Sequence, residues 1–526
     1  MSEDLTKLKE RAEAAKYRAE ISDAQLKSKA SNLRKKEMSR LYEAATNDAQ
    51  HPRRGSNYSA DATIQQSTDA LRNYARWLDE NHDLAIGILD ELENRIVGRG
   101  IQISPRAKDK NGKPAKEWNA AVLKLFKLWC KSKPEASRTL TWTEIQRLLV
   151  RTKFRDGEVF IQHLEGKNAG IKHTGPVPYS IELIEPDFCP YNYMRSPNQV
   201  NGQRKILAGV EINAWKQPIG YHMFREHPGD MLLALARGNY DTKFISAEQV
   251  THLKFVRRLS QVRGVSVMHG VLRRLEDIKE YEESERIAAR VAAAFTAIIT
   301  KDKDTNITGT YNSTTNQRQL EMSPGMIFDN LMPGENIETI GSDRPNTNLP
   351  EYRGGQLRAV ASGTKTNASS ISKDYRGTYS SQRQELVEGQ EGYATETKIM
   401  ADSFFNDVYT RFVDMAVMSG RVSVEGIDIE SLYDFAYVGP AVPWIEPKKE
   451  AEAQIMLKNE KIKSRRQVQQ GFGLDPEETD NEIEADNLMS QQQELVLPKK
   501  PDDELETETE EDEENERDID ARAAAS

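Results

Sequence analysis

A long helical pattern without proline lies between about Val267 and Ile298. Apolar residues recur at helical spacing near both ends of this stretch: Met268, Leu272, Leu275 and Ile278, then Ile287, Val291, Phe295 and Ile298. Between them, residues 279–286 are almost wholly charged. A helix over these residues, with Ser266 as N-cap, would be about 48 Å long at about 1.5 Å per residue. Because a polar middle cannot lie in a core, we expect a helix anchored at both ends that bridges bodies or packs against its own copies. A surface helix of a single globule is the alternative.

The chain before this stretch alternates between helical and strand-like periods. Helical spacing predicts helices over 1–45, 67–97, 117–129 and 141–154. From residue 157 the period changes, and strands are predicted over 158–164, 179–184, 206–213, 220–224, 244–246 and 250–255. The predicted fold class is therefore α+β, with one body of about 200 residues.

The chain after this stretch changes character again. Residues 301–349 are rich in Asn, Thr, Gly and Pro, with strand-like pieces at 326–328 and 336–340, and predict a small β-rich module. A short helix over 352–360, a small-residue loop over 362–372 and a long helix over 378–420 are predicted next. Residues 444–489 predict charged helix broken at Gly471–Gly473.

Composition and charge indicate the kind of environment in which the protein is found. The 526 residues are 37% hydrophobic and 30% charged, and no apolar run approaches the roughly 20 residues that span a bilayer. The N-terminal residues lack the apolar core of a secretory signal, and two cysteines without a CxxC motif fit a reducing cytoplasm. The net charge of -10 does not describe the chain outside the acidic tail. Asp502–Glu516 holds 11 acidic and no basic residues, which leaves 72 acidic against 73 basic residues elsewhere.

The sequence shows no catalytic constellation. Gly363-Thr-Lys365-Thr366 lacks the GK pair and the earlier glycine of a phosphate-binding loop. The eight histidines have no metal-ligand spacing, and structural roles are expected for His252 and His269. We therefore predict no catalytic residues, no cofactor and no metal site.

Basic residues gather where the long helical pattern begins. Arg257, Arg258, Arg263, Arg273 and Arg274 precede a run of acids that extends from Glu276 to Glu285. Two interpretations stay open: salt bridges between subunits, or weak, sequence-independent contact with a phosphate backbone.

Short motifs recur in a characteristic order between about residues 60 and 490. They are Ile96-Val-Gly98-Arg-Gly100-Ile101, Gly157-Glu-Val-Phe160, Ala208-Gly-Val-Glu-Ile-Asn213, Pro218-Ile-Gly220-Tyr221, Arg258-Leu-Ser-Gln261-Val-Arg263-Gly264-Val265, Ser323-Pro-Gly325, Leu331-Met-Pro333-Gly334-Glu335, Arg344-Pro345, Gln356-Leu-Arg358-Ala-Val-Ala361, Tyr379-Ser-Ser-Gln-Arg383, Pro443-Trp444, Lys448-Lys-Glu450 and Lys463-Ser-Arg-Arg466. In this order the chain resembles the portal proteins of lambda-like tailed phages and prophages. It departs from the family after Ala361, where Gly363–Ser370 replaces the usual Gly-Val pair and aromatic residue.

The resemblance implies a ring, typically a dodecamer, at one vertex of an icosahedral capsid. Double-stranded DNA would pass through it without sequence recognition, driven by the large terminase subunit. Major capsid or scaffold protein, head-completion (adaptor) proteins and tail proteins would be the other partners, with no membrane involved. The protein would be located in the virion, and in the host cytoplasm during assembly. The alternatives are a minor capsid or scaffold-like interaction protein and, less in keeping with the sequence, a packaging nuclease or ATPase.

The resemblance also assigns segments. They are an N-terminal helical arm (1–60), an α/β wing (61–263), a stem helix (264–299), a β-rich clip (300–347), a second stem helix (348–362), a channel loop (363–377), wing helices (378–440), a helical crown (441–490) and an acidic tail (491–526). Candidate DNA-facing residues of the channel loop are Lys365, Asn367, Lys373 and Arg376. Candidate stem charges that line the channel or bond neighbouring subunits are Arg273, Arg274, Glu276, Glu280, Glu283 and Arg286.

Overall fold

The computed structural model divides the chain into two compact units, Met1–Thr63 and Ile64–Ser526. The residues it describes are 2–38, 57–167, 171–197, 203–230, 242–294, 298–301, 335–338, 348–441 and 447–492. The first unit contains helix α1 (Ser2–Met38), whose described side chains are all exposed. A helix near the N-terminus was expected from the sequence, and this expectation is confirmed.

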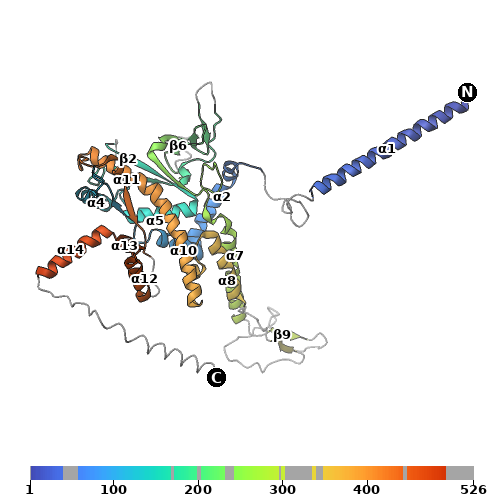
Figure 1. Ribbon diagram of the computed structural model, residues 1–526. Helices are drawn as coiled ribbons and strands as arrows, with labels where there is room; N and C mark the ends of the chain where they lie inside the picture. Colours follow the sequence, from blue (N-terminus) through green and yellow to red (C-terminus); the bar gives the residue numbers. More distant parts are fainter. Residues whose placement is uncertain are drawn as a thin grey trace, which may run out of the picture. The chain divides into compact units, whose positions relative to one another are not determined.

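The second unit combines helices with antiparallel sheets, so the predicted α+β class is confirmed (Figure 1). One sheet has the order β3-β2-β8, with β2 at Glu158–Glu165, β3 at Tyr179–Ile184 and β8 at Val250–Lys254. The other has the order β4-β5-β6-β7, formed by Lys205–Leu207, Val210–Ile212, Pro218–Phe224 and Thr242–Ser246. Short 3₁₀ turns lie at Pro186–Phe188 (η2), Ala247–Gln249 (η3), Val267–Gly270 (η4) and Ile429–Ser431 (η6).

The single strand predicted over 206–213 is wrong. Ala208 and Gly209 have φ angles of 48° and 80°, and they form a tight turn that folds β4 back on β5. Two residues of positive φ are what a two-residue hairpin requires, because this turn matches the twist of the strands. The unbroken apolar run concealed the turn, since alanine rarely adopts this conformation.

The single helix predicted over 67–97 is also wrong. It is divided into α2 (Ala60–Asn81) and α3 (Asp83–Ile96) at His82, whose backbone is extended. The His82 ring caps α3 by accepting a hydrogen bond from the Leu84 N–H at 3.2 Å. Its other nitrogen bonds the Leu275 carbonyl at 2.8 Å. A long-range contact therefore fixes the break, and the apolar periodicity could not show it.

The core lies where α4 (Lys116–Lys131) and α5 (Trp142–Asp156) pack on α10 (Tyr379–Met400), a π-helical turn labelled η5 (Ala401–Phe405) and α11 (Asn406–Met418). The Trp129 ring stacks on Tyr179 with centroids 5.4 Å apart. Phe126 meets Phe412 edge to face at 5.1 Å. Such aromatic pairs add about 0.5–1.5 kcal/mol each beyond the burial of their area. The helix predicted over 378–420 is confirmed, with the π turn inside it.

A two-stranded sheet joins distant parts of the chain. Strand β1 (Gln102–Pro105) pairs antiparallel with β11 (Phe435–Val438), with Gln102 opposite Val438. Three helices follow: α12 (Pro447–Asn459), α13 (Arg465–Gly471) and α14 (Pro476–Gln492). The break predicted at Gly471–Gly473 is confirmed, and a second break precedes the N-cap of α13. The Lys127 ammonium lies 2.8 Å from Glu478 and links α4 to α14.

Candidate functional site

Helix α7 is shorter than the sequence predicted. The Ser266 side chain accepts from the Met268 N–H at 3.1 Å, as expected of an N-cap, but the turn it caps is the 3₁₀ turn η4. α7 then runs from Leu272 to Ala294, about 34 Å at about 1.5 Å per residue, and the backbone is already strand β9 at Ile298–Lys301. The predicted helix to Ile298 is therefore wrong at both ends, because strand pairing replaces the helix at its C-terminal end.

Strand β9 pairs antiparallel with β10 (Glu335–Glu338), with Glu335 opposite Lys301. The strand predicted over 336–340 is thus confirmed in part. The strand-like piece at 326–328 and most of the predicted clip lie outside the described residues.

Helix α8 (Leu349–Thr364) lies beside α7 (Figure 1). Arg353 Nε lies 2.5 Å from a Glu282 oxygen, and Arg274 Nη1 donates to the Gln356 side chain at 2.6 Å. Gly363 permits the close approach at the C-terminal end of α8. A Cβ there would lie 2.5 Å from Val271 Cγ1. The pair is therefore fixed by packing at one end and by polar bridges along its length.

The candidate stem charges fall into two groups. Glu276 accepts a hydrogen bond from the Tyr74 hydroxyl, and Arg274 bonds to α8, so these two act within the chain. Arg273, Glu280, Glu283 and Arg286 are exposed. Glu285, inside the run expected to be polar, is buried. One acid of the charged run is therefore buried within the chain, while other charges of α7 remain exposed.

The predicted channel loop contains a helix. Lys365 ends α8 in the left-handed conformation, α9 spans Ala368–Ser372, and Lys373 is again left-handed. The small residues Ala368, Ser369 and Ser370 therefore form a helical turn, and the loop predicted over 362–372 is wrong for most of its length.

Lys365 takes part in an internal ion-pair network. Its ammonium lies 2.7 Å from one Glu396 oxygen, and the Lys153 ammonium lies 3.1 Å from the other. Burial alone would raise the pKa of Glu396, but Lys153 and Lys365 outweigh burial and lower it. Lys365 is therefore anchored to α10, although its side chain is half-exposed.

The other three candidate channel residues differ in their bonding. The Asn367 amide donates to the Glu385 carbonyl at 3.1 Å, which ties the start of α9 to α10. Lys373 lies 3.9 Å from Glu91 and stays two-thirds exposed. Arg376 pairs with Asp374 at 2.7 Å and is 85% exposed. Lys373 and Arg376 are therefore more exposed than Lys365 and Asn367.

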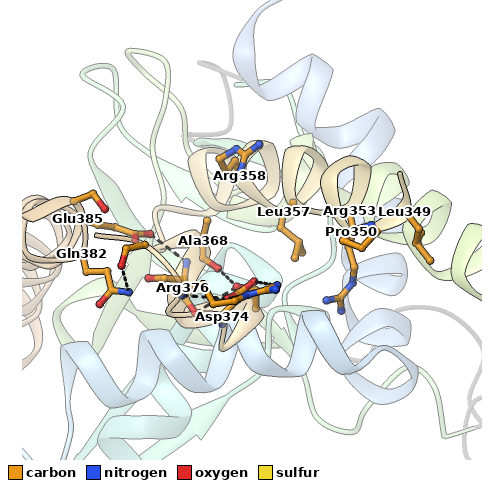
Figure 2. Close-up of a pocket in the computed structure, with 15 residues that line it drawn as sticks. Leu349, Pro350, Arg353, Leu357, Arg358, Ala368, Asp374, Arg376, Gln382 and Glu385 are labelled. Carbon is orange, nitrogen blue, oxygen red and sulfur yellow. Dashed lines mark hydrogen bonds and ion pairs between the residues drawn. The ribbon is translucent and has the colours of Figure 1, made fainter. Parts of the chain in front are cut away.

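A cavity of about 630 Å³ lies between α8, α9 and the start of α10. Figure 2 shows Asp374 and Arg376 paired on one side of it, with Arg353 and Leu357 projecting from α8. The remaining labelled lining residues are Leu349, Pro350, Arg358, Ala368, Gln382 and Glu385. Its lining mixes apolar side chains with side chains of both signs of charge.

The segment that precedes η4 is held by a buried ion pair. Arg263, 1% exposed, contacts Glu158 Oε1 through Nε at 2.8 Å and Nη2 at 2.6 Å, and its Nη1 donates to the Ala208 carbonyl at 2.6 Å. Its guanidinium carbon lies 3.8 Å from the centre of the Tyr191 ring. The sequence suggested that Arg263 belongs to a surface cluster of basic residues. This is wrong, because the bonds of Arg263 lie inside the chain.

Glu158 organises the other side of this ion pair. Its second oxygen accepts from the Gly264 N–H at 2.7 Å and bonds His252 Nε2 at 3.0 Å. Burial alone would raise the pKa of Glu158, but Arg263 and His252 outweigh burial and hold the pKa well below its usual range. Burial lowers the pKa of His252 to about 4 despite Glu158. His252 is thus a structural partner, which agrees with the sequence analysis.

Two further observations concern ligands and membranes. Within the described ranges, Glu185, Asp187 and His227 place potential ligand atoms within 4.8 Å of one another. However, Arg76 already lies 2.6 Å from Asp187 and would compete with a cation. Among the described helices, none combines the length and the apolar character that a membrane span needs.

Comparisons with known proteins identify a relationship over most of the chain. The family described as "Phage portal protein, lambda family" matches residues 46–396. A relative named "Probable portal protein", from Halomonas phage phiHAP-1, is 23% identical over 439 residues, which cover 81% of this chain and 82% of the relative.

Solved structures of low sequence identity are also similar. A chain from the neck of a native gene transfer agent particle, computed with C12 symmetry, is 11% identical with a TM-score of 0.42 and covers 79% of this chain and 99% of its own. A chain from the virion of the native gene transfer agent particle is 10% identical with a TM-score of 0.40 and covers 78% and 94%, respectively.

Proposed function

Because this chain belongs to the lambda family of phage portal proteins, we propose that it assembles into the closed ring through which double-stranded DNA enters and leaves a capsid. The observation that carries the proposal is the match of the family to residues 46–396, which include α7, α8 and the segment between α8 and α10. The ring would be a homo-oligomer, with the dodecamer as the expected state, located at one vertex of the virion.

The α7–α8 pair is suited to such a ring. One face of α7 is buried within the chain, with Leu275 and Ile278 at 0% and 3% exposure, while the opposite face is charged and exposed. A ring built from identical subunits uses two different patches that meet head to tail, and it closes when the rotation between subunits divides the circle. A charged, exposed helix face on each subunit can serve as one of these patches.

The α9 segment is our candidate for contact with DNA. Lys373 and Arg376 are exposed, whereas Lys365 and Asn367 are bound to α10. A few basic side chains per subunit would touch the phosphates without holding the duplex, since affinity rises steeply with the number of phosphates neutralised. DNA contact through Lys373 and Arg376, with Lys365 and Asn367 as supports, suits a conduit that must let DNA pass.

The remaining partners follow from the proposed role. Strands β9 and β10 pair within and at the start of the segment assigned to the clip. We expect the large terminase subunit, and later the head-completion and tail proteins, to dock on this segment. Capsid or scaffold protein would contact the wing. Assembly would take place in the host cytoplasm, and we expect neither ATPase nor nuclease activity.

Electron microscopy and native mass spectrometry of the purified full chain test the proposal. Closed rings with a central hole, of one defined subunit number, are the expected result. In parallel, ATP hydrolysis and DNA cleavage are assayed, and both are expected to stay at background. Monomers at all concentrations would instead support a minor capsid or scaffold-like protein, and intrinsic ATP hydrolysis would support a packaging enzyme.

A further inference from the structure

Two loops that lie near each other present large apolar side chains to solvent. Trp215, in the turn between β5 and β6, is 90% exposed, and Leu259, in the loop between β8 and η4, is 96% exposed. The Lys216 ammonium donates to the Ser260 carbonyl at 3.3 Å and links the two loops. We call Trp215, Lys216 and residues 256–260 the loop pair.

The first loop is held in one shape by a side chain at its base. The Asn213 side-chain oxygen accepts from the backbone N–H groups of Trp215 and Gln217, both at 2.9 Å. Its amide nitrogen donates to the Gln217 side chain at 3.0 Å. Lys216 has a φ of 62°, a conformation that most residues avoid. These bonds hold the turn, so Trp215 is presented on a fixed support.

The second loop is built in the same way. The Gln261 side-chain oxygen accepts from the N–H groups of Arg257 and Arg258, at 3.0 and 3.2 Å. Its amide nitrogen donates to the Phe255 and Arg263 carbonyls, at 3.1 and 2.7 Å. Gln261 and Arg263 of the motif Arg258–Val265 thus have roles within the chain. Leu259 has no such role, because it points its whole side chain into solvent.

An ordered apolar pair on the surface is typical of a binding site. Trp is enriched among the residues that dominate binding energy, and a preordered loop loses little conformational entropy on binding. Val256, on the same loop as Leu259, is also half-exposed. The neighbouring Arg257 and Arg258 are exposed and basic. The complementary surface is therefore an apolar spot flanked by carboxylates.

The exposed face of α7 has this character. Glu280, Glu283 and Ile287 lie three to four residues apart, so they occupy one face of the helix. Both glutamates are exposed, and Ile287 is 46% exposed although it was expected to be an anchor. One chain thus carries a basic apolar surface and a helix face on which two carboxylates precede Ile287, both open to solvent.

We propose that the loop pair of one subunit docks on the Glu280–Ile287 face of α7 in the adjacent copy. The inference rests on the proposed ring, in which each interface joins two different patches of the same chain. Trp215 and Leu259 would cover Ile287, and Arg257 and Arg258 would face Glu280 and Glu283. Through this contact, the body of one subunit would fix the position of α7 in the adjacent subunit.

Cysteine crosslinking tests the contact directly. Leu259→Cys combined with Ile287→Cys, oxidised mildly after assembly of the full chain, is expected to give a ladder of covalent oligomers on denaturing gels. Each single variant should give none. Leu259→Cys with Met418→Cys is the matched control, because Met418 is 76% exposed but lies outside the proposed contact. Rings that form by electron microscopy but give no ladder would overturn this contact and leave the ring intact. Absence of rings in the wild type would overturn the proposed function itself.

Charge exchange provides an independent test. Arg257→Glu with Arg258→Glu should raise the concentration needed for half-assembly by about tenfold or more, because like charges would oppose each other. Adding Glu280→Lys with Glu283→Lys should restore assembly. Lys110→Glu with Lys116→Glu makes the same change of charge at exposed positions elsewhere and should assemble as the wild type does. The proposed contact would be contradicted if the Arg257→Glu, Arg258→Glu variant assembled as the wild type does. It would also be contradicted if Glu280→Lys with Glu283→Lys did not restore assembly. Either result would favour a different protein as the partner that binds the loop pair.

Discussion

Arg263 and Arg376 are both arginines in segments that the sequence analysis singled out, yet the structure gives them opposite roles. Arg263 is 1% exposed and bonds Glu158 and three backbone carbonyls. Arg376 is 85% exposed and bonds only to the neighbouring Asp374 among the interactions described. A buried guanidinium that loses its partner leaves an uncompensated charge, whereas an exposed pair contributes little to stability. The first arginine therefore holds the fold, and the second is free to serve function.

Loss of Arg263 is the strongest test of this difference. Arg263→Ala should lower the free energy of unfolding by about 3–5 kcal/mol, because Glu158 would remain buried without its cation. Denaturant unfolding followed by circular dichroism measures the change. Arg257→Ala, at an exposed position of the same motif region, should stay within about 0.5 kcal/mol of the wild type. Equal effects at the two positions would remove the distinction between buried and exposed arginines.

Gly363 tests the packing at the C-terminal end of α8. Gly363→Ala should destabilise the fold by about 1–3 kcal/mol, because the new methyl group would lie 2.5 Å from Val271 Cγ1. Gly355, on the same helix, has no atom within 4 Å of its would-be Cβ. Gly355→Ala is therefore expected to stabilise the helix by roughly 0.5–1 kcal/mol. Thermal unfolding of both variants gives the sign, and destabilisation by both would show that α8 tolerates no added side chain.

The Glu158 site should also make stability depend on pH. Burial lowers the pKa of His252 to about 4 from an ordinary value of 6.5. As pH falls through this window, the unfolded chain takes up a proton that the folded chain does not, so the free energy of unfolding decreases. His163, whose pKa is lowered to about 3, adds in the same direction. His252→Asn should flatten the decline between pH 6.5 and 4, and an unchanged slope would show that His252 does not titrate as its burial predicts.

Substitutions in the channel segment should have the smallest effect on the free energy of unfolding, but they should change DNA packaging. Lys373→Glu with Arg376→Glu should change the free energy of unfolding by no more than about 0.5 kcal/mol, since both side chains are largely exposed. The same variant should package or retain less DNA, measured as nuclease-protected DNA per particle. Lys110→Glu with Lys116→Glu is the matched control. Unchanged packaging and retention in the test variant would exclude these two side chains as DNA contacts.

The family and the main elements could be predicted from the sequence, because both depend on local patterns. The order of the short motifs indicated the lambda-like portal family, and the match to residues 46–396 confirms it. Helical spacing also placed α4, α5, α10 and α11 correctly. These features depend on residues that are close together in the sequence, so they can be predicted without knowledge of long-range contacts.

The errors arose where distant residues decide the outcome. His82 breaks a helix because it bonds Leu275, which lies almost two hundred residues away. Arg263 looked like a surface cation because its partner Glu158 lies 105 residues away in the sequence. The ion pair between Lys365 and Glu396 was likewise not predicted, because it depends on how α8 and α10 meet. The channel residues and the segment boundaries stay predictions.

The pairing of β1 with β11 determines how late in synthesis the subunit can finish folding. Residues 102–105 leave the ribosome more than three hundred residues before their partners at 435–438. At about 5–20 residues per second, this delay is roughly 15–70 s. During that interval the β1 backbone lacks its partner strand, and Trp129 and Phe126 lack the α11 side of the core. Each subunit can therefore offer a finished surface to its neighbours only after residues 435–438 have been made, which separates folding in time from assembly.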